Sequence, residues 1–302
     1  MTMFGPENLR QNVLLRDYVT FKIGGPAELF YEATTSKDLV AAVAYAKGHG
    51  LPCFVMGGGS NLVVSDAGID GLVIHNASRD CSLVDPQAHQ ITISAGYDLG
   101  ELVKMAYGNS LTGVESLTGI PGSVGGAIYG NAGAYGRSIA DILVDAEVLL
   151  PDGRILTVDN AFFKFEYRTS RLKQDQIIVL KARFQLEPGI REEIHAKMAD
   201  IMTQRHSKHP DRSIGCAGSF FKNLPPLPGE DRRRAAGAVL EQVGAKEMSV
   251  GGASVYQKHA NFIINEGKAT AADVKKLAQL LKAKVMNDFG IELSEEVLYI
   301  GR

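Results

Sequence analysis

Two glycine-rich segments constrain what this chain can fold into. The first, "VMGGGSNLVVSD" (55–66), places three glycines, Ser60 and Asn61 between two short apolar runs. The second, "GIPGSVGGAIYGNAGAYG" (119–136), spaces single and paired glycines between apolar residues. Glycine loses more conformational entropy on ordering than any other residue, so such clusters indicate backbone that needs a special conformation or a close approach. Each segment is therefore predicted to be a loop against which something packs.

The chemistry of these loops favours an anionic or elongated ligand. Closely spaced backbone N–H groups form a concavity that binds anions, and Ser60 and Asn61 add side-chain donors. The expected ligand is therefore a phosphate or pyrophosphate group. A plain tight connection between strands is the alternative for either loop. The apolar run 62–64 is short and soon broken by Asp66 and Gly68, which argues against the glycine turn of a dinucleotide-binding Rossmann fold. The segment also lacks the Gly-Lys-Ser/Thr ending of a P-loop.

Composition places the chain among globular proteins. With 302 residues, 45% hydrophobic and 22% charged, it can form one large or two to three ordinary domains. No apolar run approaches the length of a membrane span and the N-terminus lacks a signal-peptide pattern, so a cytoplasmic location is expected. The net charge of -2 gives no general attraction to nucleic acid or membranes. We expect no nucleic-acid partner, no membrane insertion and no obligate protein partner.

Several other groups of reactive or charged residues have ordinary interpretations. Cys53, Cys81 and Cys216 are odd in number and widely spaced, which predicts reduced thiols buried as small apolar side chains. His206 and His209 lack a further clear ligand, so no metal site is expected. The basic runs 205–212 and 231–237 are either solvated faces or attractors for a phosphorylated substrate.

Hydrophobic periodicity and capping residues predict a mixed α and β chain, with a boundary between two parts near Glu187-Pro188-Gly189. In the first part the expected elements are strands at 27–33, 71–76, 89–96 and 176–186, a helix from Lys37 to His49 capped by Ser36, a helix capped by Asp98 through Tyr107, and a hairpin at 145–159. In the last part they are helices near 190–206, 232–243 and 271–289, and strands at 253–257, 261–265 and 295–301.

Six motifs give the chain a specific resemblance. They are "TFKIGGPA" (20–27), "GGGSNLVVSD" (57–66), "GIPGSVGGAIYGNAGAYG" (119–136), "YRTS" (167–170), "GSFFKN" (218–223) and "EEVLYIG" (295–301). In order and rough spacing they resemble the UDP-N-acetylenolpyruvylglucosamine reductase family, also known as UDP-N-acetylmuramate dehydrogenases, over essentially the whole chain. The short interval between "YRTS" and "GSFF" is similar to the shorter subclass of that family, which lacks an inserted tyrosine-bearing loop.

The resemblance implies an α+β fold with a two-lobed FAD-binding region of the vanillyl-alcohol-oxidase-like (PCMH) type, followed by an α+β substrate-binding domain. The implied bounds are 1–187 for the FAD-binding region, with lobes of about 1–76 and 77–187, and 188–302 for the substrate-binding domain. Ser60 stands where some flavoproteins of this wider class attach FAD through a histidine, so the resemblance implies non-covalent FAD. The implied FAD-binding residues are Gly57, Gly58, Gly59, Ser60, Asn61, Gly119, Ile120, Pro121, Gly122, Ser123, Gly125, Gly126 and Ala127.

The resemblance also implies the reaction and three catalytic residues. NADPH would reduce the flavin, which would pass hydride from N5 to the enolpyruvyl group of a UDP-linked amino sugar in peptidoglycan precursor synthesis. Arg168 would hold the carboxylate that gains charge, and Ser219 would protonate the carbanionic carbon. Glu296, placed directly before Val297, would assist the intermediate by donating a hydrogen bond, which requires burial to raise its pKa.

Substrate contacts are implied for Tyr167, Lys222 and Asn223. The chain departs from the family at Leu298, where an arginine is often found, so no supporting charge is expected there. Two alternatives stay open: an oxidase or dehydrogenase of the same flavin fold that acts on an alcohol or lactone, and a nucleotide-sugar-binding protein that has lost flavin. Oxygen consumption with small alcohols would favour the first, and a colourless protein that binds the UDP-sugar would favour the second.

Overall fold

The computed structural model describes residues 4–302, and the chain divides into two compact units. The first unit comprises Met1–Gln11, Leu29–Gly58 and Gly71–Arg205, and the second comprises Asn12–Glu28, Gly59–Asp70 and His206–Arg302. Both units are therefore assembled from separate stretches of the sequence. The division expected at residue 187 concerns the FAD-binding and substrate-binding functions, and it stays a prediction.

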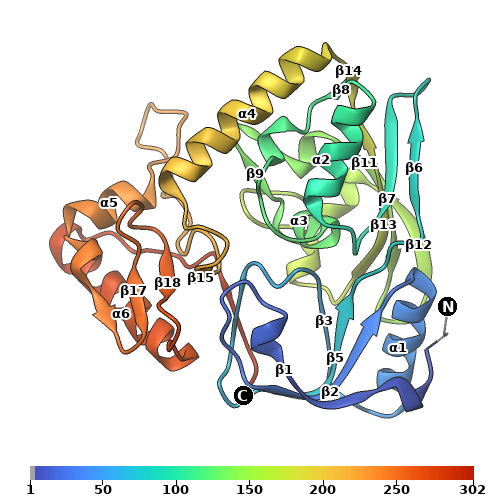
Figure 1. Cartoon of the computed structure of the whole chain (residues 1–302), viewed down its shortest axis with the longest axis horizontal. Helices are drawn as coiled ribbons and strands as arrows, with labels where there is room; N and C mark the ends of the chain where they lie inside the picture. The colour runs from blue at the N-terminus through green and yellow to red at the C-terminus, as the bar shows by residue number, and fades with distance from the viewer. Residues whose placement is uncertain (1–3) are drawn as a thin grey trace. The chain divides into compact units, whose positions relative to one another are not determined.

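An antiparallel five-stranded sheet forms the larger part of the first unit. Its spatial order is β12 (Ile155–Asp159), β11 (Leu143–Leu149), β13 (Ile178–Gln185), β7 (Gln90–Ser94) and β6 (Ser82–Asp85). Helices α2 (Leu99–Gly108) and α3 (Val124–Gly130) lie on one face of this sheet (Figure 1). The expected hairpin is confirmed, because β11 and β12 pair antiparallel around a turn closed by the N–H of Gly153 on the carbonyl of Leu150 at 2.9 Å.

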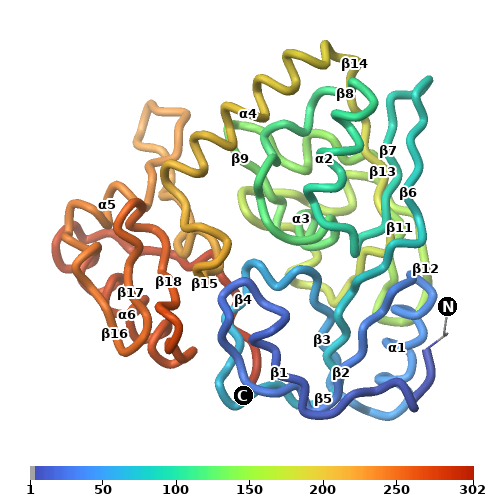
Figure 2. Tube along the Cα trace, in the orientation of Figure 1, coloured from blue at the N-terminus to red at the C-terminus, as the bar shows by residue number. Residues whose placement is uncertain are grey.

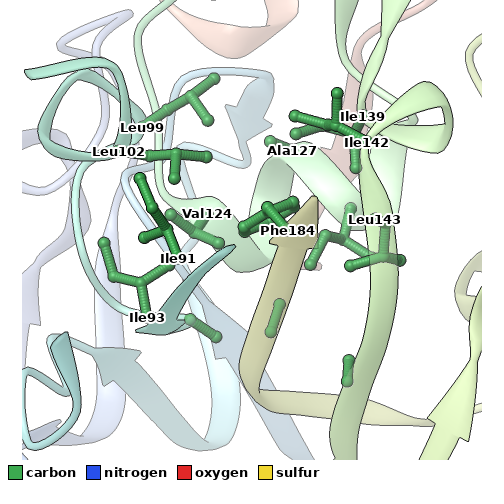
Figure 3. Close-up of a cluster of buried hydrophobic side chains, with 14 of the residues drawn as sticks. Ile91, Ile93, Leu99, Leu102, Val124, Ala127, Ile139, Ile142, Leu143 and Phe184 are labelled. Carbon is green, nitrogen blue, oxygen red and sulfur yellow. The ribbon is translucent and has the colours of Figure 1, made fainter. Parts of the chain in front are cut away.

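The core of this unit lies between the sheet and the two helices. Apolar side chains that alternate along the strands meet the apolar sides of α2 and α3, and Figure 3 shows Ile91, Ile93, Leu99, Leu102, Val124, Ala127, Ile139, Ile142, Leu143 and Phe184 converging. Asp98 caps α2 as expected, since its carboxylate accepts the N–H of Gly100 at 2.8 Å. Burial of such aliphatic and aromatic side chains contributes about 1.5–3 kcal/mol each and fixes the sheet beneath α3.

A second sheet in the order β1-β2-β5-β3 packs against α1. The elements are β1 (Arg10–Leu14), β2 (Pro26–Ala33), β5 (Ile69–Asn76), β3 (Cys53–Met56) and α1 (Ser36–Gly48). Leu39, Ala42 and Ala46 on α1 are buried with Ile74 of β5. The expectation that Ser36 caps α1 is wrong. Thr35 takes that place because its hydroxyl accepts the N–H of Asp38 at 3.1 Å.

The second unit contains a small antiparallel sheet covered by helices. Its elements are β15 (Gly215–Cys216), β18 (Ile263–Asn265), β17 (Ala253–Val255), β16 (Ser249–Val250), α5 (Ala236–Gln242) and α6 (Ala271–Phe289). The bounds of α6 match the prediction, because Thr270 and Asp273 form a capping box and Gly290 adopts a left-handed conformation. Helix α5 begins four residues later than expected. Arg234 is held extended by backbone hydrogen bonds to Leu224, so the helix cannot include it.

The end of the chain joins the second unit through a parallel strand pair. Strand β19 (Leu298–Ile300) pairs with β4 (Leu62–Val64), and the red C-terminal trace runs beside β4 in Figure 2. Val63 of β4 is buried with Phe21, Phe220 and Val297 in the core of this unit. The last strand is shorter than expected because Glu295 bridges to Phe221 instead of continuing the pairing with β4.

The remaining elements are short except for α4. They are α4 (Arg191–Lys208), β8 (Leu111–Thr112), β14 (Glu187–Pro188), β9 (Gly133–Ala134), β10 (Arg137–Ser138), and the 3-10 helices Pro6–Asn8, Leu15–Asp17, Glu115–Leu117, Ile139–Asp141, Asn160–Phe163, Arg171–Lys173 and Ala245–Glu247. The three cysteines are free thiols, but the expectation that they are buried is wrong: Cys53 is exposed and the other two are half-buried. No helix within residues 4–302 is long and apolar enough to cross a membrane.

Candidate active site

The two glycine-rich segments touch each other within the first unit. A Cβ atom on Gly58 would lie 3.0 Å from the Cα of Gly122, and one on Gly57 would collide with the hydroxyl of Ser123. Real Cβ atoms rarely approach other atoms so closely, so side chains at these two positions would push the loops apart. Close packing between the loops, against backbone at Gly58 and against the Ser123 side chain at Gly57, therefore accounts for two of the three consecutive glycines.

Gly59 has a different constraint. Its φ of +61° lies in the left-handed region, and a Cβ there would collide with the carbonyl of Tyr18 and lie 2.8 Å from the Cα of Val19. Its own carbonyl accepts the N–H of Thr20 at 3.2 Å. The motif that contains Thr20 and the first glycine segment thus pack directly against each other.

Helix α3 begins inside the second glycine segment and was not expected from the sequence. Ser123 caps it by accepting the N–H of Gly126 at 3.2 Å, and the N–H of Gly125 donates to the carbonyl of Ala95 at 2.8 Å. The glycine content conceals the helix, because glycine has low helix propensity. Gly119 and Gly122, with φ values of +74° and +123°, bring the chain into the cap.

These loops fit an anionic cofactor. Directly before Gly119, the hydroxyl of Thr118 is buried and has no hydrogen-bond partner within residues 4–302. Buried polar atoms are normally paired, so an unpaired hydroxyl beside glycine-rich backbone suits a ligand with several oxygen acceptors. A pyrophosphate-containing cofactor such as FAD meets that requirement.

Arg168 lies at the tip of a tight turn in the first unit. Glu166 and Thr169 exchange backbone hydrogen bonds of 3.1 and 3.2 Å, and Arg168 between them has a φ of +56°. Such a conformation is uncommon for a residue with a side chain and marks a position that the surroundings impose. Its Nη2 donates to the carbonyl of Gly133 at 2.7 Å, and its own carbonyl accepts from Lys173 at 2.8 Å.

The C-terminal end of α3 holds this turn in place. Asn131, which is left-handed at the end of α3, donates from Nδ2 to the carbonyl of Glu166 at 2.9 Å. Ser170 donates its hydroxyl proton to the carbonyl of Tyr129 at 2.7 Å. The helix that starts in the second glycine segment therefore ends at the turn that presents Arg168.

In the second unit, backbone pairing brings the Ser219 segment next to Glu296. The N–H of Glu296 donates to the carbonyl of Phe220 at 2.8 Å, and the N–H of Lys222 donates to the carbonyl of Ser294 at 2.8 Å. Ser219 is half-buried and follows Gly218, whose φ of +76° and open surroundings permit a sharp turn. The two residues with proposed proton roles are thus on neighbouring extended segments, although they are 77 positions apart (296 − 219).

A buried asparagine fixes the other edge of that segment. Asn261 accepts the N–H of Phe221 on Oδ1 at 2.9 Å and donates from Nδ2 to the carbonyl of Phe221 at 2.8 Å. Its carbonyl also accepts the N–H of Phe220 at 2.8 Å. Because these hydrogen bonds replace a neighbouring strand, Asn261 immobilises the backbone that carries Ser219. Its importance was not recognised from the sequence, where it appears only as part of a strand.

The two adjacent glutamates have different surroundings. Glu295 lies 3.6 Å from Lys282 of α6 and interacts with the hydroxyl of Tyr299, whose pKa is raised by burial and by the Glu295 charge. Glu296 is half-buried, and its carbonyl accepts from the side-chain amide of Asn61 at 3.0 Å. Asn61, expected to bind the cofactor, therefore has a contact that positions the backbone of Glu296. Leu298 donates its N–H to the carbonyl of Asn61 at 3.0 Å and brings no charge there.

The expected substrate-binding residues are half-buried. Asn223 accepts the N–H of Ala236 on Oδ1 at 3.2 Å at the start of α5, a structural contact that the sequence did not indicate. Tyr167 lies beneath Arg168, with the guanidinium carbon 5.2 Å from the ring centre. Within residues 4–302 no cluster of three or more potential metal ligands is found.

Comparison with known proteins agrees with this geometry. The sequence model of an FAD binding domain matches residues 27–159, and that of the C-terminal domain of UDP-N-acetylenolpyruvoylglucosamine reductase matches residues 209–300. A reductase of that name from Synechococcus sp. (strain RCC307) is 39% identical over 97% of this chain and 94% of its own length. The chain belongs to the UDP-N-acetylenolpyruvoylglucosamine reductase family.

Two further relatives extend this result. The UDP-N-acetylenolpyruvoylglucosamine reductase of Solibacter usitatus is 40% identical, with 94% of each chain covered. The crystal structure of UDP-N-acetylenolpyruvylglucosamine reductase from Thermus caldophilus superimposes with a TM-score of 0.79 and 34% identity over 96% of this chain and 99% of that one. The family resemblance and the α+β fold with an FAD-binding domain are confirmed, and the chain is an FAD-dependent flavoprotein oxidoreductase of peptidoglycan precursor synthesis.

Proposed function

We propose that the chain reduces UDP-N-acetylenolpyruvylglucosamine to UDP-N-acetylmuramate, with NADPH as electron donor, in the cytoplasm. The observation that carries the proposal is the backbone pairing of Phe220 with Glu296 in a chain of this reductase family. That pairing supports a joint role for a hydroxyl and a carboxyl group beside a substrate that must gain a proton. The relatives that this chain resembles are named as reductases of that substrate, which supports its identity.

The two glycine-rich segments would hold FAD, which when bound would supply the transfer of hydride from NADPH to the methylene carbon of the enolpyruvyl group. The neighbouring carbon then gains an electron pair, which is delocalised into the attached carboxylate. A proton at that carbon completes the lactyl ether, so NADPH and one proton are consumed for each vinyl ether reduced. The task of the protein is therefore to hold a growing negative charge and to supply one proton.

Arg168 is proposed to hold the carboxylate. Its planar guanidinium forms two parallel hydrogen bonds with a carboxylate, and its imposed turn conformation orients it before the ligand arrives. The hydrogen bond from Nη2 to the carbonyl of Gly133 fixes one end of the guanidinium group. Because the group is planar, this bond also limits the orientation of its other nitrogens.

Ser219 is proposed to donate the proton, and Glu296 is proposed to stabilise the charged intermediate by hydrogen bonding. Serine is a weak acid, so its position beside the substrate must compensate for its high pKa. The two hydrogen bonds between the Asn261 side chain and the backbone of Phe221, here called the Asn261 clamp, limit the motion of the segment that carries Ser219. Glu296 is held from both sides, by Phe220 through its N–H and by Asn61 through its carbonyl.

Binding of FAD is assigned to Gly57–Asn61 and Gly119–Ala127, and contacts to the nucleotide sugar are assigned to Tyr167, Lys222 and Asn223. We also propose that residues 1–187 form the FAD-binding region and that residues 188–302 form the substrate-binding domain. FAD is proposed to bind non-covalently, because Ser60 stands where some related flavoproteins have the histidine that attaches the cofactor.

The test is an anaerobic spectrum of the purified protein during two additions. NADPH should bleach the flavin, and UDP-N-acetylenolpyruvylglucosamine should restore its colour, whereas UDP-N-acetylglucosamine, which lacks the vinyl ether, should not. Bleaching without recovery on the enolpyruvyl sugar would contradict the substrate assignment. Failure to bind FAD even after reconstitution would contradict the reductase function itself.

A further inference from the structure

Arg168 has a backbone conformation that arginine does not favour. Glu166 and Thr169 close a four-residue turn, and Arg168 at the third position of this turn has a φ of +56°. Turns with a positive φ at that position usually have glycine or asparagine there, because most side chains crowd their own backbone in this conformation. Other parts of the first unit must therefore stabilise Arg168 against relaxation to negative φ.

The peptide group that follows Arg168 is held at both of its polar ends. Its N–H, which belongs to Thr169, donates to the carbonyl of Glu166 at 3.2 Å. Its carbonyl, which belongs to Arg168, accepts from Nζ of Lys173 at 2.8 Å. A residue leaves the left-handed region only when the peptide groups on its two sides rotate relative to each other. The hydrogen bond from Lys173 therefore opposes the relaxation of Arg168.

Lys173 is itself fixed in place by α3. It is half-buried at the end of the 3-10 helix Arg171–Lys173, and its Nζ lies 5.6 Å from the centre of the Tyr129 ring. A cation at this distance is attracted to the face of the ring. The carbonyl of Tyr129 also accepts the hydroxyl proton of Ser170 at 2.7 Å. One residue of α3 therefore anchors both Ser170 and Lys173 beside the turn.

A charged donor is well suited to this position. A hydrogen bond from an ammonium group to a carbonyl is charge-assisted, so it is stronger than one between neutral groups. We propose that Lys173 is a positioning residue of the active site, which keeps Arg168 in the left-handed conformation and so orients its guanidinium for the carboxylate of the substrate. The proposal rests on the proposed function, in which Arg168 binds that carboxylate.

The experiment compares holoenzymes that carry Lys173→Met, Lys173→Arg, Arg168→Met, the double substitution Lys173→Met with Arg168→Met, and Lys164→Met. Methionine keeps an unbranched side chain over Tyr129 and removes the charged donor, whereas arginine keeps the charge and the donors. Lys164→Met removes an exposed lysine shortly before the turn and serves as the matched control. Lys173→Gln provides a second uncharged variant if Lys173→Met does not fold.

The measured quantities are the dissociation constants of two nucleotide sugars, obtained from changes in the flavin spectrum. UDP-N-acetylmuramate has the carboxylate that Arg168 is proposed to bind, and UDP-N-acetylglucosamine lacks it. Lys173→Met should weaken the binding of UDP-N-acetylmuramate by about fivefold or more, whereas the binding of UDP-N-acetylglucosamine should change by less than about twofold. Lys173→Arg should recover part of the loss.

The double substitution tests whether Lys173 acts through Arg168. If it does, Lys173→Met has no further effect once Arg168 has been replaced, so the double variant binds UDP-N-acetylmuramate as Arg168→Met does. If the losses of the two single variants multiply instead, Lys173 contacts the ligand independently and the proposal is wrong. It is equally wrong if Lys173→Met behaves as Lys164→Met does, or if it weakens the binding of both sugars to the same extent.

Failure of the proposed function gives a different pattern. If Arg168→Met leaves the preference between the two sugars unchanged, Arg168 does not bind the carboxylate, and a positioning role of Lys173 fails with it. A wild-type enzyme that holds flavin but binds neither sugar would have the same consequence. If Arg168→Met weakens only the binding of UDP-N-acetylmuramate and Lys173→Met has no effect, the proposed function stands and Lys173 alone is refuted.

Discussion

The N–H of Glu296 lies 2.8 Å from the carbonyl oxygen of Phe220, and this hydrogen bond joins the two segments that carry the proposed proton donor and the proposed stabilising carboxyl group. Because the hydrogen bond involves backbone atoms, it persists when either side chain is replaced. Substitutions at Ser219 and Glu296 therefore test chemistry with little disturbance of the fold.

Replacement of Glu296 by glutamine is expected to lower kcat by about 10²- to 10³-fold, because a positioned acid is lost from a site that holds developing charge. The pH-rate profile should also change. The matched control is Glu295→Gln, which loses only the partly exposed contacts with Lys282 and Tyr299 and should change kcat by less than about threefold. Equal rates and an unchanged pH-rate profile for Glu296→Gln would refute its assignment.

Replacement of Ser219 by alanine should slow the turnover of the enolpyruvyl sugar by about 10²-fold or more, with NADPH oxidation in the first half-reaction unaffected. Stopped-flow spectra of the two half-reactions separate these effects. Ser249→Ala removes an exposed hydroxyl from β16 of the same unit and should leave both rates unchanged. Slowing of both half-reactions in Ser219→Ala would indicate a structural role.

Replacement of Asn261 by alanine should destabilise the second unit by about 2–4 kcal/mol, because the N–H and carbonyl of buried Phe221 both lose their partner. Urea unfolding measures the change. The substitution should also reduce kcat, since the backbone that carries Ser219 becomes free to move. A variant with wild-type stability would show that this clamp is dispensable.

Gly59→Ala should be far more harmful than Gly136→Ala. Both glycines have positive φ, but a Cβ on Gly59 collides with Tyr18 and Val19, whereas one on Gly136 meets no atom within 4 Å. The conformational penalty alone is about 1 kcal/mol, which is the expected loss for Gly136→Ala. Thermal unfolding with and without FAD should show a larger loss for Gly59→Ala. Similar losses would mean that the close packing at Gly59 contributes nothing.

Stability should fall as the pH drops below about 6.5. Burial lowers the pKa of His259, partly opposed by Glu241, and neutral Nδ1 accepts the N–H of Asn261 at 3.2 Å. Because the folded pKa is lowered, the unfolded chain binds the proton more readily, so stability is complete above the unfolded pKa of about 6.5 and declines below it. Urea unfolding between pH 7.5 and 5.5 measures this slope, and His259→Gln should reduce it. An identical slope in that variant would assign the effect to other groups.

Local signals were sufficient for many elements of this fold. The capping box at Thr270 and the glycine at 290 mark both ends of α6, Asp98 marks the start of α2, and the Pro-Asp-Gly turn marks the β11–β12 hairpin. In each case the residues that determine the structure lie within one or two turns of each other. The six motifs were sufficient to identify the family because each is a short stretch of sequence with its own conformational requirement.

Long-range relationships could not be predicted in this way. Nothing local indicates that Phe220 pairs with Glu296 or that Asn261 replaces a strand beside Phe221, because both depend on how distant segments meet. The burial of Arg205 is hidden for a similar reason: in the sequence it is one of several basic residues, and only packing against Gly119 separates it from them. The left-handed backbone of Arg168 likewise depends on its anchors at Gly133 and Asn131.

The parallel pair of β4 and β19 has a consequence for synthesis on the ribosome. Val64 leaves the ribosome 236 residues before Ile300, the residue that it faces (300 − 64). At roughly 5–20 residues per second, β4 waits on the order of tens of seconds for its partner. During that interval the nascent chain exposes Phe21 and Val63, whose apolar surroundings are built from residues made later. A chaperone that binds short apolar segments would therefore find its target near the beginning of the protein, long before the reductase is complete.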